Sequence, residues 1–302
     1  MVSSIANLAA VLVLAPFLLG VINKTKAFVA GRKGPPLLQV YFDLVKLLRK
    51  GFVVSSTTTW VFLAGPVLSV VAPFVAALLL PLGGRPALLS FTGDMILFVS
   101  VFALARFFVA AAAMDTGSPF EGMGAAREVT FSALAEPALL FGMLALTRMT
   151  GSLSLTVMFD LGAASAWRKA SASIVLILAS WFIVLLAENA RVPFDDPNTH
   201  LELTMIHEVM VLDHAGPAFG FIVYGAALKL TVFATLLVTL LIPSRSGSHA
   251  LAFVLFAGGL IGVSVVVGLV ESSMARLRLV RVPQLLVTAT LLAAFAVVLV
   301  LR

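Results

Sequence analysis

The chain of 302 residues alternates between long apolar runs and short polar segments. Six runs approach or exceed the ~20 residues that carry a helix across a bilayer. They cover residues 61–80, 96–113, 174–187, 219–242, 251–270 and 285–301. These runs lack the alternation of polar and apolar positions that the strands of a membrane barrel need. The pattern therefore predicts an all-α, polytopic integral membrane protein.

Together with two weaker runs, the pattern predicts about eight transmembrane helices in one transmembrane domain over residues 1–302. The first run has no basic residues before it and is followed by Lys24 and Lys26, so we expect a retained anchor rather than a cleaved signal peptide. The loops on one side are expected at about 24–59, 115–130, 189–217 and 272–284. The expected spans are 4–23, 60–82, 94–114, 131–150, 172–188, 218–242, 251–271 and 285–301.

The composition agrees with a membrane location. Hydrophobic residues make up 61% of the chain and charged residues 11%, and the mean hydropathy is +1.12. A soluble domain has about 25% charged residues. The chain contains no cysteine, which excludes disulfides and cysteine-ligated metal or iron–sulfur sites within it. Its net charge of +6 is explained by topology and anionic lipid, without a nucleic-acid partner.

Basic residues divide unevenly between the two sides of the predicted bundle. The positive-inside rule places the richer side in the cytoplasm and both termini outside the cell membrane. The acidic residues agree, because only Asp94 and Asp160 clearly belong to the outer side. The twelve basic residues of the predicted cytoplasmic side are Lys24, Lys26, Arg32, Lys33, Lys46, Arg49, Lys50, Arg127, Arg191, Arg276, Arg278 and Arg281, and the six of the other side are Arg85, Arg148, Arg168, Lys169, Arg245 and Arg302.

The segment from Glu188 to Gly216 concentrates the ionisable groups. It holds six of the 14 acidic residues and three of the four histidines. In a membrane protein such a concentration indicates function. Pro193 is expected to end the fifth span, and Asp196 to cap a new helix with Pro197 at its first position.

Two histidines of that expected helix, His200 and His207, lie two turns apart and are predicted to face one polar cavity. Binding of a metal ion and hydrogen bonding to neighbouring carboxylates are both open, and the many non-metal roles of histidine favour the second. A zinc protease is excluded, because the sequence after His207 lacks the second histidine of the zinc motif. We therefore predict no metal site.

Some charged residues fall inside the predicted spans. A charge there is costly unless it is paired or hydrated. Arg106 and Lys229 therefore need partners, and Glu136 and Glu188 are the natural candidates. The alternative, in which the charges reach the membrane surface, is weak for Lys229 because it lies near the middle of its span.

The predicted cytoplasmic loops offer candidates for docking a partner. Residues 37–50 have the pattern of an amphipathic interfacial helix, for which binding to lipid headgroups is an equally good interpretation. Three arginines of the last loop cannot share one helix face, which suits spread contacts with a partner. The loop at 115–130 contains glycines and a Ser-Pro pair, which predict a flexible turn-rich segment, and its Arg127 and Glu128 are expected either to dock a partner or to form a plain surface pair.

Four motifs together resemble the complex I subunit 1 (H subunit) family, and they cover nearly the whole chain in order. The segment from Glu188 to Asp195 is similar to the family signature Ala-Glu-x-x-Arg-x-Pro-Phe-Asp. The stretch 31–50 resembles the family's first basic loop, Arg127 and Glu136 match its Arg…Glu element, and 271–283 resembles its arginine-rich last loop. The family fold, with eight spans and both ends outside, agrees with the pattern.

Within that family, the stretches 195–208 and 212–217 are similar to the membrane-anchor subunit of formate hydrogenlyase and related energy-converting nickel–iron hydrogenases. Glu202 matches a family glutamate, and a later family glutamate matches Glu208 or Asp213. The resemblance implies that this chain is a non-catalytic subunit of an oxidoreductase complex. Its partners would be large and small hydrophilic hydrogenase-like subunits, an iron–sulfur subunit and antiporter-like membrane subunits, which would carry the iron–sulfur clusters and the nickel–iron centre.

The chain itself would then dock the redox arm and couple electron transfer to proton or sodium translocation. We expect alanine at Glu188 or Asp195 to abolish coupling and leave assembly intact. The candidate ion-coupling residues are Arg106, Glu136, Glu188, Arg191, Asp195, Glu202, Glu208, Asp213 and Lys229. The candidate docking residues are Arg32, Lys33, Asp43, Lys46, Arg127, Glu128, Glu271, Arg276, Arg278 and Arg281.

Three other functions stay open at this point. A quinone-site subunit of a respiratory NADH dehydrogenase-like complex would use the same loops. A stand-alone ion transporter also fits eight spans with internal charges, although the two halves show no repeat. A purely structural anchor would use the charges only to satisfy one another and to dock partners.

Overall fold

The structure, a computed structural model, describes residues 2–160, 167, 170–195, 205–242 and 248–301. Within these ranges there is no β-strand, and eight helices are long and apolar enough to cross a membrane, which confirms the predicted number. The eight helices are α1 (Val2–Val29), α3 (Trp60–Leu79), α4 (Asp94–Asp115), α5 (Pro119–Thr150), α8 (Ser171–Glu188), α9 (Gly216–Leu241), α10 (His249–Ser273) and α11 (Val282–Leu301). The shorter helices are α2 (Gln39–Leu48), α6 (Leu155–Asp160), η1 (Glu208–Val211) and η2 (Leu279–Arg281).

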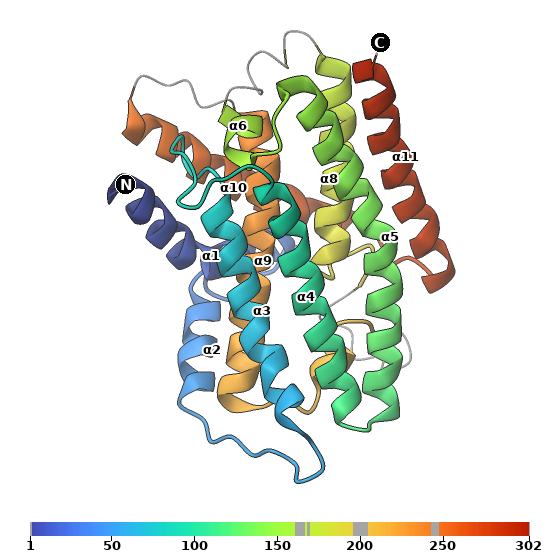
Figure 1. Cartoon of the computed structure of the whole chain (residues 1–302). Helices are drawn as coiled ribbons and strands as arrows, with labels where there is room; N and C mark the ends of the chain where they lie inside the picture. The colour runs from blue at the N-terminus through green and yellow to red at the C-terminus, as the bar shows by residue number, and fades with distance from the viewer. Residues whose placement is uncertain (1, 161–166, 168–169, 196–204, 243–247, 302) are drawn as a thin grey trace.

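Helix α9 forms the centre of the molecule. It contacts α1, α2, α3, α8 and α10, and most of its side chains are buried. Helix α3 packs against α4 and α9, while α5 packs against α4, α8 and α11. Figure 1 shows these helices running side by side, with α1 and α10 crossing them at an angle. The largest cluster of buried apolar residues draws on all eight long helices and includes Leu230, Phe233 and Leu237 of α9.

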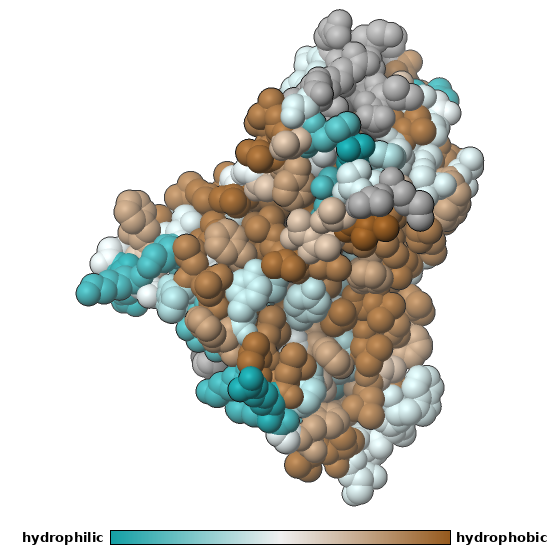
Figure 2. All heavy atoms as spheres, turned by 90° about the vertical axis from the view of Figure 1, so that its left-hand side faces the viewer, coloured by the Kyte–Doolittle hydropathy of each residue, from teal (hydrophilic) through white to brown (hydrophobic). Residues whose placement is uncertain are grey.

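The lipid-facing character of the surface follows from the same apolar pattern. Large apolar side chains are exposed on every long helix, for example Phe107 on α4 and Leu291 on α11. Figure 2 shows the face on the side of α1, α2 and α10, where apolar residues predominate and hydrophilic residues gather in separate patches. Helix α2 lies in the stretch that was predicted to form an amphipathic helix. It buries Val40 and half-buries Tyr41 and Leu44, while Asp43 and Lys46 are exposed.

Helix α5 corrects one prediction. The expected loop 115–130 is mostly helical, because α5 begins at Pro119 rather than near residue 131. Proline is favourable in the first turn of a helix, where its missing N–H costs nothing. Gly124 serves close packing, since a Cβ atom there would lie 2.4 Å from Cγ1 of Val209. Residues 119–130 therefore carry their side chains on defined helix faces.

The acidic segment after α8 differs from the expected helix in its described part. Residues 205–207 are not helical, and a single turn of 3₁₀-helix covers Glu208–Val211 before α9 begins. The expected cap at Asp196 and the start of that helix lie outside the described residues, as do His200 and Glu202. The cytoplasmic placement of the loops and the location of both termini stay predictions.

Candidate functional site: a buried chain of ion pairs beside a cavity

Four charged side chains from four helices form linked ion pairs inside the protein. Arg106 of α4 contacts Glu136 of α5 through Nη2, and its Nη1 lies 3.1 Å from Oε1 of Glu188 at the end of α8. Nζ of Lys229, on α9, lies 2.8 Å from Oε2 of Glu188. The partners expected for the two intramembrane cations are thus confirmed. Glu188 therefore links Arg106 and Lys229, and these two cations together compensate the charge of its buried carboxylate.

The end of α8 holds Glu188 in place. Ala190 adopts a left-handed conformation with φ of 47°, a conformation that glycine usually supplies at helix ends. The N–H of Arg191 donates back to the carbonyl of Leu186 at 2.9 Å, which satisfies a free carbonyl of the last turn. The chain therefore leaves the helix directly after the carboxylate and turns away from it.

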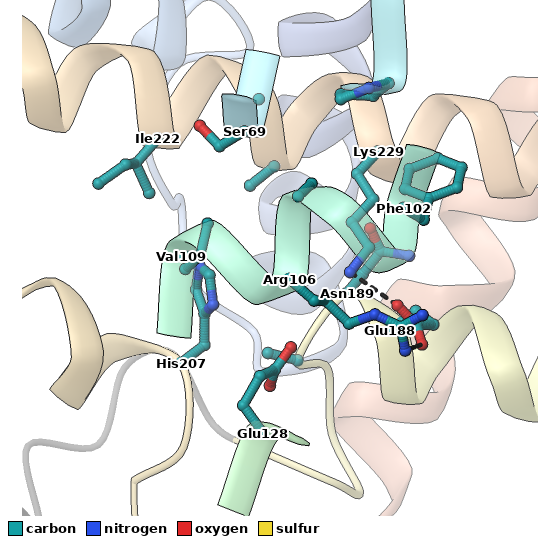
Figure 3. Close-up of a pocket in the computed structure, with 15 residues that line it drawn as sticks. Ser69, Phe102, Arg106, Val109, Glu128, Glu188, Asn189, His207, Ile222 and Lys229 are labelled. Atoms are coloured by element: carbon teal, nitrogen blue, oxygen red, sulfur yellow. Dashed lines mark hydrogen bonds and ion pairs between the residues drawn. The ribbon is translucent and has the colours of Figure 1, made fainter. Parts of the chain in front are cut away.

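A cavity of about 80 Å³ adjoins the ion pairs. Since a cavity needs about 10–15 Å³ on this measure to hold one water molecule, the cavity has room for several waters. Figure 3 shows Arg106, Glu128, Glu188, Lys229 and His207 around it. Its other lining residues are Ser69, Pro73, Phe102, Ala105, Val109, Asn189, Ala190, Ile222, Gly225 and Ala226.

Two smaller cavities of about 10 Å³ each extend this polar region in both directions. One of them shares Glu128 and Glu188 with the main cavity and is also lined by Asp195. The other shares Arg106 and Glu188 with it and is also lined by Glu136. Each has about the volume that one water molecule requires. Ionisable groups and small cavities thus succeed one another from the loop after α8 to α5.

Glu128 and His207, two residues of the main cavity, compare differently with the expectations from the sequence. Glu128 lines the cavity instead of forming a surface pair, while its neighbour Arg127 donates to the carbonyl of Met205 at 2.9 Å. His207 lines the cavity as expected. Burial lowers the pKa of His207, and the nearby carboxylate of Glu208 offsets this only in part, so the imidazole is neutral at pH 7.

Asp195 organises the loop that follows α8. Its side chain is 1% exposed, and its Oδ1 lies 2.9 Å from Nη2 of Arg276. Its Oδ2 accepts the N–H groups of Ile206 at 3.0 Å and His207 at 3.1 Å. The same loop is fixed to the chain after α10, because the N–H of Leu277 donates to the carbonyl of Pro193 at 2.9 Å. Asp195 therefore holds His207 against the cavity.

Glu271 lies in a second group of buried charges. Its carboxylate lies 2.8 Å from Nζ of Lys26 and 3.4 Å from Nη1 of Arg191. These contacts connect α1, the end of α10 and the loop after α8. Glu271 and Arg276, which were candidates for docking a partner, thus make ion pairs within this chain, and Arg191 pairs with Glu271 rather than with the residues around the cavity.

The remaining candidates divide by exposure. Asp213 is exposed, and Glu208 is half-buried in the turn before α9. The structure brings neither of them to the cavity. The candidate docking residues that are exposed are Arg32, Lys33, Asp43, Lys46, Arg278 and Arg281.

Glu121 was missed by the sequence analysis. It lies in the first turn of α5, is 1% exposed, and accepts the N–H of Asp213 at 3.0 Å through Oε1. The signal was present in Pro119 and the acid two residues later, a usual pattern for a helix start. It was overlooked because this stretch was predicted to be a loop.

The fold and the buried ion pairs define a polytopic helical membrane protein built around ionisable groups. The family profile described as NADH dehydrogenase matches residues 2–302. The chain therefore belongs to this family, that of complex I subunit 1 (H subunit), and it is a complex I-like membrane subunit.

Individual relatives agree with this assignment. The chain is 33% identical to formate hydrogenlyase subunit 4 of Escherichia coli (strain K12) over 278 residues, which is 90% of this chain and 89% of the relative. It is 30% identical to hydrogenase-4 component C of the same strain over 240 residues, 80% and 75% of the two chains. A chain in the structure of the membrane-bound sulfane sulfur reductase, an archaeal respiratory membrane complex, has the same fold, with a TM-score of 0.83, 20% identity and 98% of both chains covered.

Proposed function

We propose that this chain anchors the hydrophilic redox arm of a formate hydrogenlyase-type complex and couples its electron transfer to movement of protons or sodium ions. The observation that carries the proposal is the succession of ion pairs and cavities from Asp195 to Glu136. The electron carriers would belong to partners, as iron–sulfur clusters and a nickel–iron centre, since this chain has no cysteine to ligate clusters.

The coupling would be electrostatic. Two unit charges 4 Å apart interact by about 4 kcal/mol at an effective dielectric constant of about 20. A change of charge at the docked arm would alter the proton affinity of the nearest carboxylates. Through Glu188, which pairs with both cations, that change would reach Arg106 and Glu136. Antiporter-like partner subunits would receive it and move the ion.

Docking of the redox arm would use the exposed charges. Arg278 and Arg281 follow α10, and Arg32 and Lys33 follow α1. Exposed basic residues of this kind guide association with an acidic surface and contribute more to orientation than to affinity. The buried ion pair of Asp195 and Arg276 would stabilise the loops that carry this surface and would not contact the arm.

The size of the cavity bears on the quinone alternative. Sites for small organic molecules typically have volumes of about 300–1,000 Å³. The cavity beside Glu188, at about 80 Å³, suits water and ions better than a quinone headgroup. We therefore favour the hydrogenase-type function over a quinone site.

Purification of the tagged chain in mild detergent tests this proposal. We expect nickel, iron and hydrogen-evolving activity to co-purify with the chain. Flavin- and iron-containing partners without nickel, together with quinone-dependent oxidation, would instead support the respiratory alternative. A chain that purifies alone and moves ions in liposomes would be a transporter, and the proposal would be wrong.

A further inference from the structure

The ion pairs beside the cavity are balanced without Glu128. The cations are Arg106 and Lys229, and the carboxylates in contact with them are Glu136 and Glu188. Glu128 lines the same cavity but takes part in none of the ion pairs found among the described residues. An ionised Glu128 would therefore add an uncompensated negative charge to a buried cluster, which is unfavourable.

The charged groups around Glu128 on the neighbouring elements that the structure describes lead to the same balance. Arg106 on α4 and Lys229 on α9 are already used by the carboxylate of Glu188 on α8. The loop after α8 contributes Asp195, which is matched by an arginine of its own. The segment before α9 contributes His207, which is neutral because burial lowers its pKa.

The position of Glu128 connects it with Glu188. Both residues line the main cavity and the smaller cavity that reaches Asp195. In Figure 3 the carboxylate of Glu128 points into the space between His207 and Arg106, while Lys229 reaches to Glu188 from α9. Waters in a cavity of this size can bridge polar groups that do not touch.

We propose that Glu128 carries the mobile proton of this cavity, holding it at rest and exchanging it with Glu188. In the exchange the carboxylic acid of Glu128 loses its proton to cavity water, and the carboxylate of Glu188 takes one up. The ammonium group of Lys229 then changes its partner from Glu188 to Glu128. The total charge of the cluster is the same before and after, so no further ion is needed. The inference rests on the proposed coupling function and names its proton carrier.

Infrared difference spectroscopy of the whole purified complex tests this inference directly. We expect the wild type to show a C=O stretching band of a buried carboxylic acid that shifts in D₂O. The substitution Glu128→Gln should remove that band and abolish coupled ion movement, while Glu128→Asp should restore both in part. A merely structural role for Glu128 would not produce this band.

Glu121→Gln is the matched control. Glu121 is a buried glutamate on α5, two turns before Glu128, and it lines none of the three cavities described above. This variant should keep both the band and the coupling. If Glu128→Gln fails to assemble, Glu128→Asp is measured instead. A C=O stretching band at the same position as in the wild type would then overturn the inference.

A second comparison separates this inference from the proposed function. If the assembled double variant Glu188→Gln/Lys229→Met loses coupling while Glu128→Gln keeps both its coupling and the band, the coupling function stands and the role of Glu128 is wrong. If both variants couple normally, both ideas are wrong. Loss of coupling and of the band in both assembled variants, with both kept in Glu121→Gln, supports both ideas, because the exchange needs both carboxyl groups.

Discussion

Tyr41 and Tyr224, the only two tyrosines of the chain, donate their hydroxyl groups to consecutive carbonyls of α1, those of Val13 and Leu12. Pro16 explains the hydrogen bond from Tyr224. It has no N–H, so the carbonyl of Leu12 has no partner within the helix. Tyr224 of α9 supplies that partner at 3.2 Å, and Tyr41 attaches α2 to the same turn.

We expect Tyr224→Phe to destabilise the protein by about 0.5–1.5 kcal/mol, because it leaves the Leu12 carbonyl without a donor. Tyr41→Phe should have a similar effect and should also loosen α2 from α1. Thermal unfolding of the purified protein, followed by circular dichroism, measures both changes. Ser100→Ala is the control, since the exposed Ser100 bonds a carbonyl of its own helix. Equal effects of all three substitutions would contradict the role assigned to the tyrosines.

The pairing of Glu188 with two cations permits a test of coupling against a purely structural anchor. Glu188→Gln leaves Arg106 and Lys229 with one carboxylate between them and should cost about 3–5 kcal/mol. In the double variant Glu188→Gln/Lys229→Met, Arg106 and Glu136 still balance each other. Unlike the first expectation from the sequence, in which substitution of Glu188 leaves assembly intact, we therefore expect the single variant to assemble poorly. The double variant should recover assembly.

Recovery of function distinguishes the two roles. If Glu188 takes part in coupling, the double variant should assemble but should not couple turnover to ion movement in inverted membrane vesicles. A structural anchor would regain both. Native gels measure assembly, and a pH- or sodium-sensitive dye measures ion movement.

The number of spans and the main ion pairs could be predicted because both follow from the cost of polar groups in lipid. A run of apolar residues as long as 219–242 has few alternatives to a spanning helix. A cation such as Lys229 in the middle of that run requires a buried carboxylate, and few were available. Local sequence was therefore sufficient for these features.

The cavity-facing role of Glu128 could not be predicted in this way. Gly122 and Gly124 suggested a flexible loop, whereas Gly124 in fact allows close contact with Val209 in a helix. Without that helix, Arg127 and Glu128 looked like a surface pair. In the helix they are about 100° apart, and only one of them faces the cavity. Which face turns inward depends on the packing of α5 against distant segments.

Asp195 provides a third prediction, which differs from the first expectation for this residue. Asp195→Ala removes the acceptor for two backbone N–H groups and the partner of Arg276. We expect faster proteolysis of the loop after α8 and poorer recovery of partner subunits, rather than a selective loss of coupling. Asp213→Asn, at an exposed position, is the control. Normal assembly with selective uncoupling in Asp195→Ala would instead place this residue among the ion-coupling groups.

His214 makes the stability of the protein depend on pH. Its ring stacks on Phe62 with the centroids 4.0 Å apart, and its Nδ1 is buried without a hydrogen-bond partner in the described structure. Burial lowers the pKa of His214 from its ordinary value of 6.5 to about 4, against the opposing effect of Asp213. Between pH 6.5 and 4 the unfolded chain therefore binds a proton that the folded chain does not. Stability must fall as the pH falls through this range.

We expect His214→Phe to keep the stacking and to remove this part of the pH dependence. The melting temperature of the variant should decline less than that of the wild type between pH 7 and pH 5. His249→Gln is the control, because His249 is exposed and its replacement should leave the pH response unchanged. Melting curves of the purified protein at both pH values decide the matter. Parallel declines in the wild type and in His214→Phe would show that protonation of His214 does not limit stability, and the pH dependence would then have to arise from other groups.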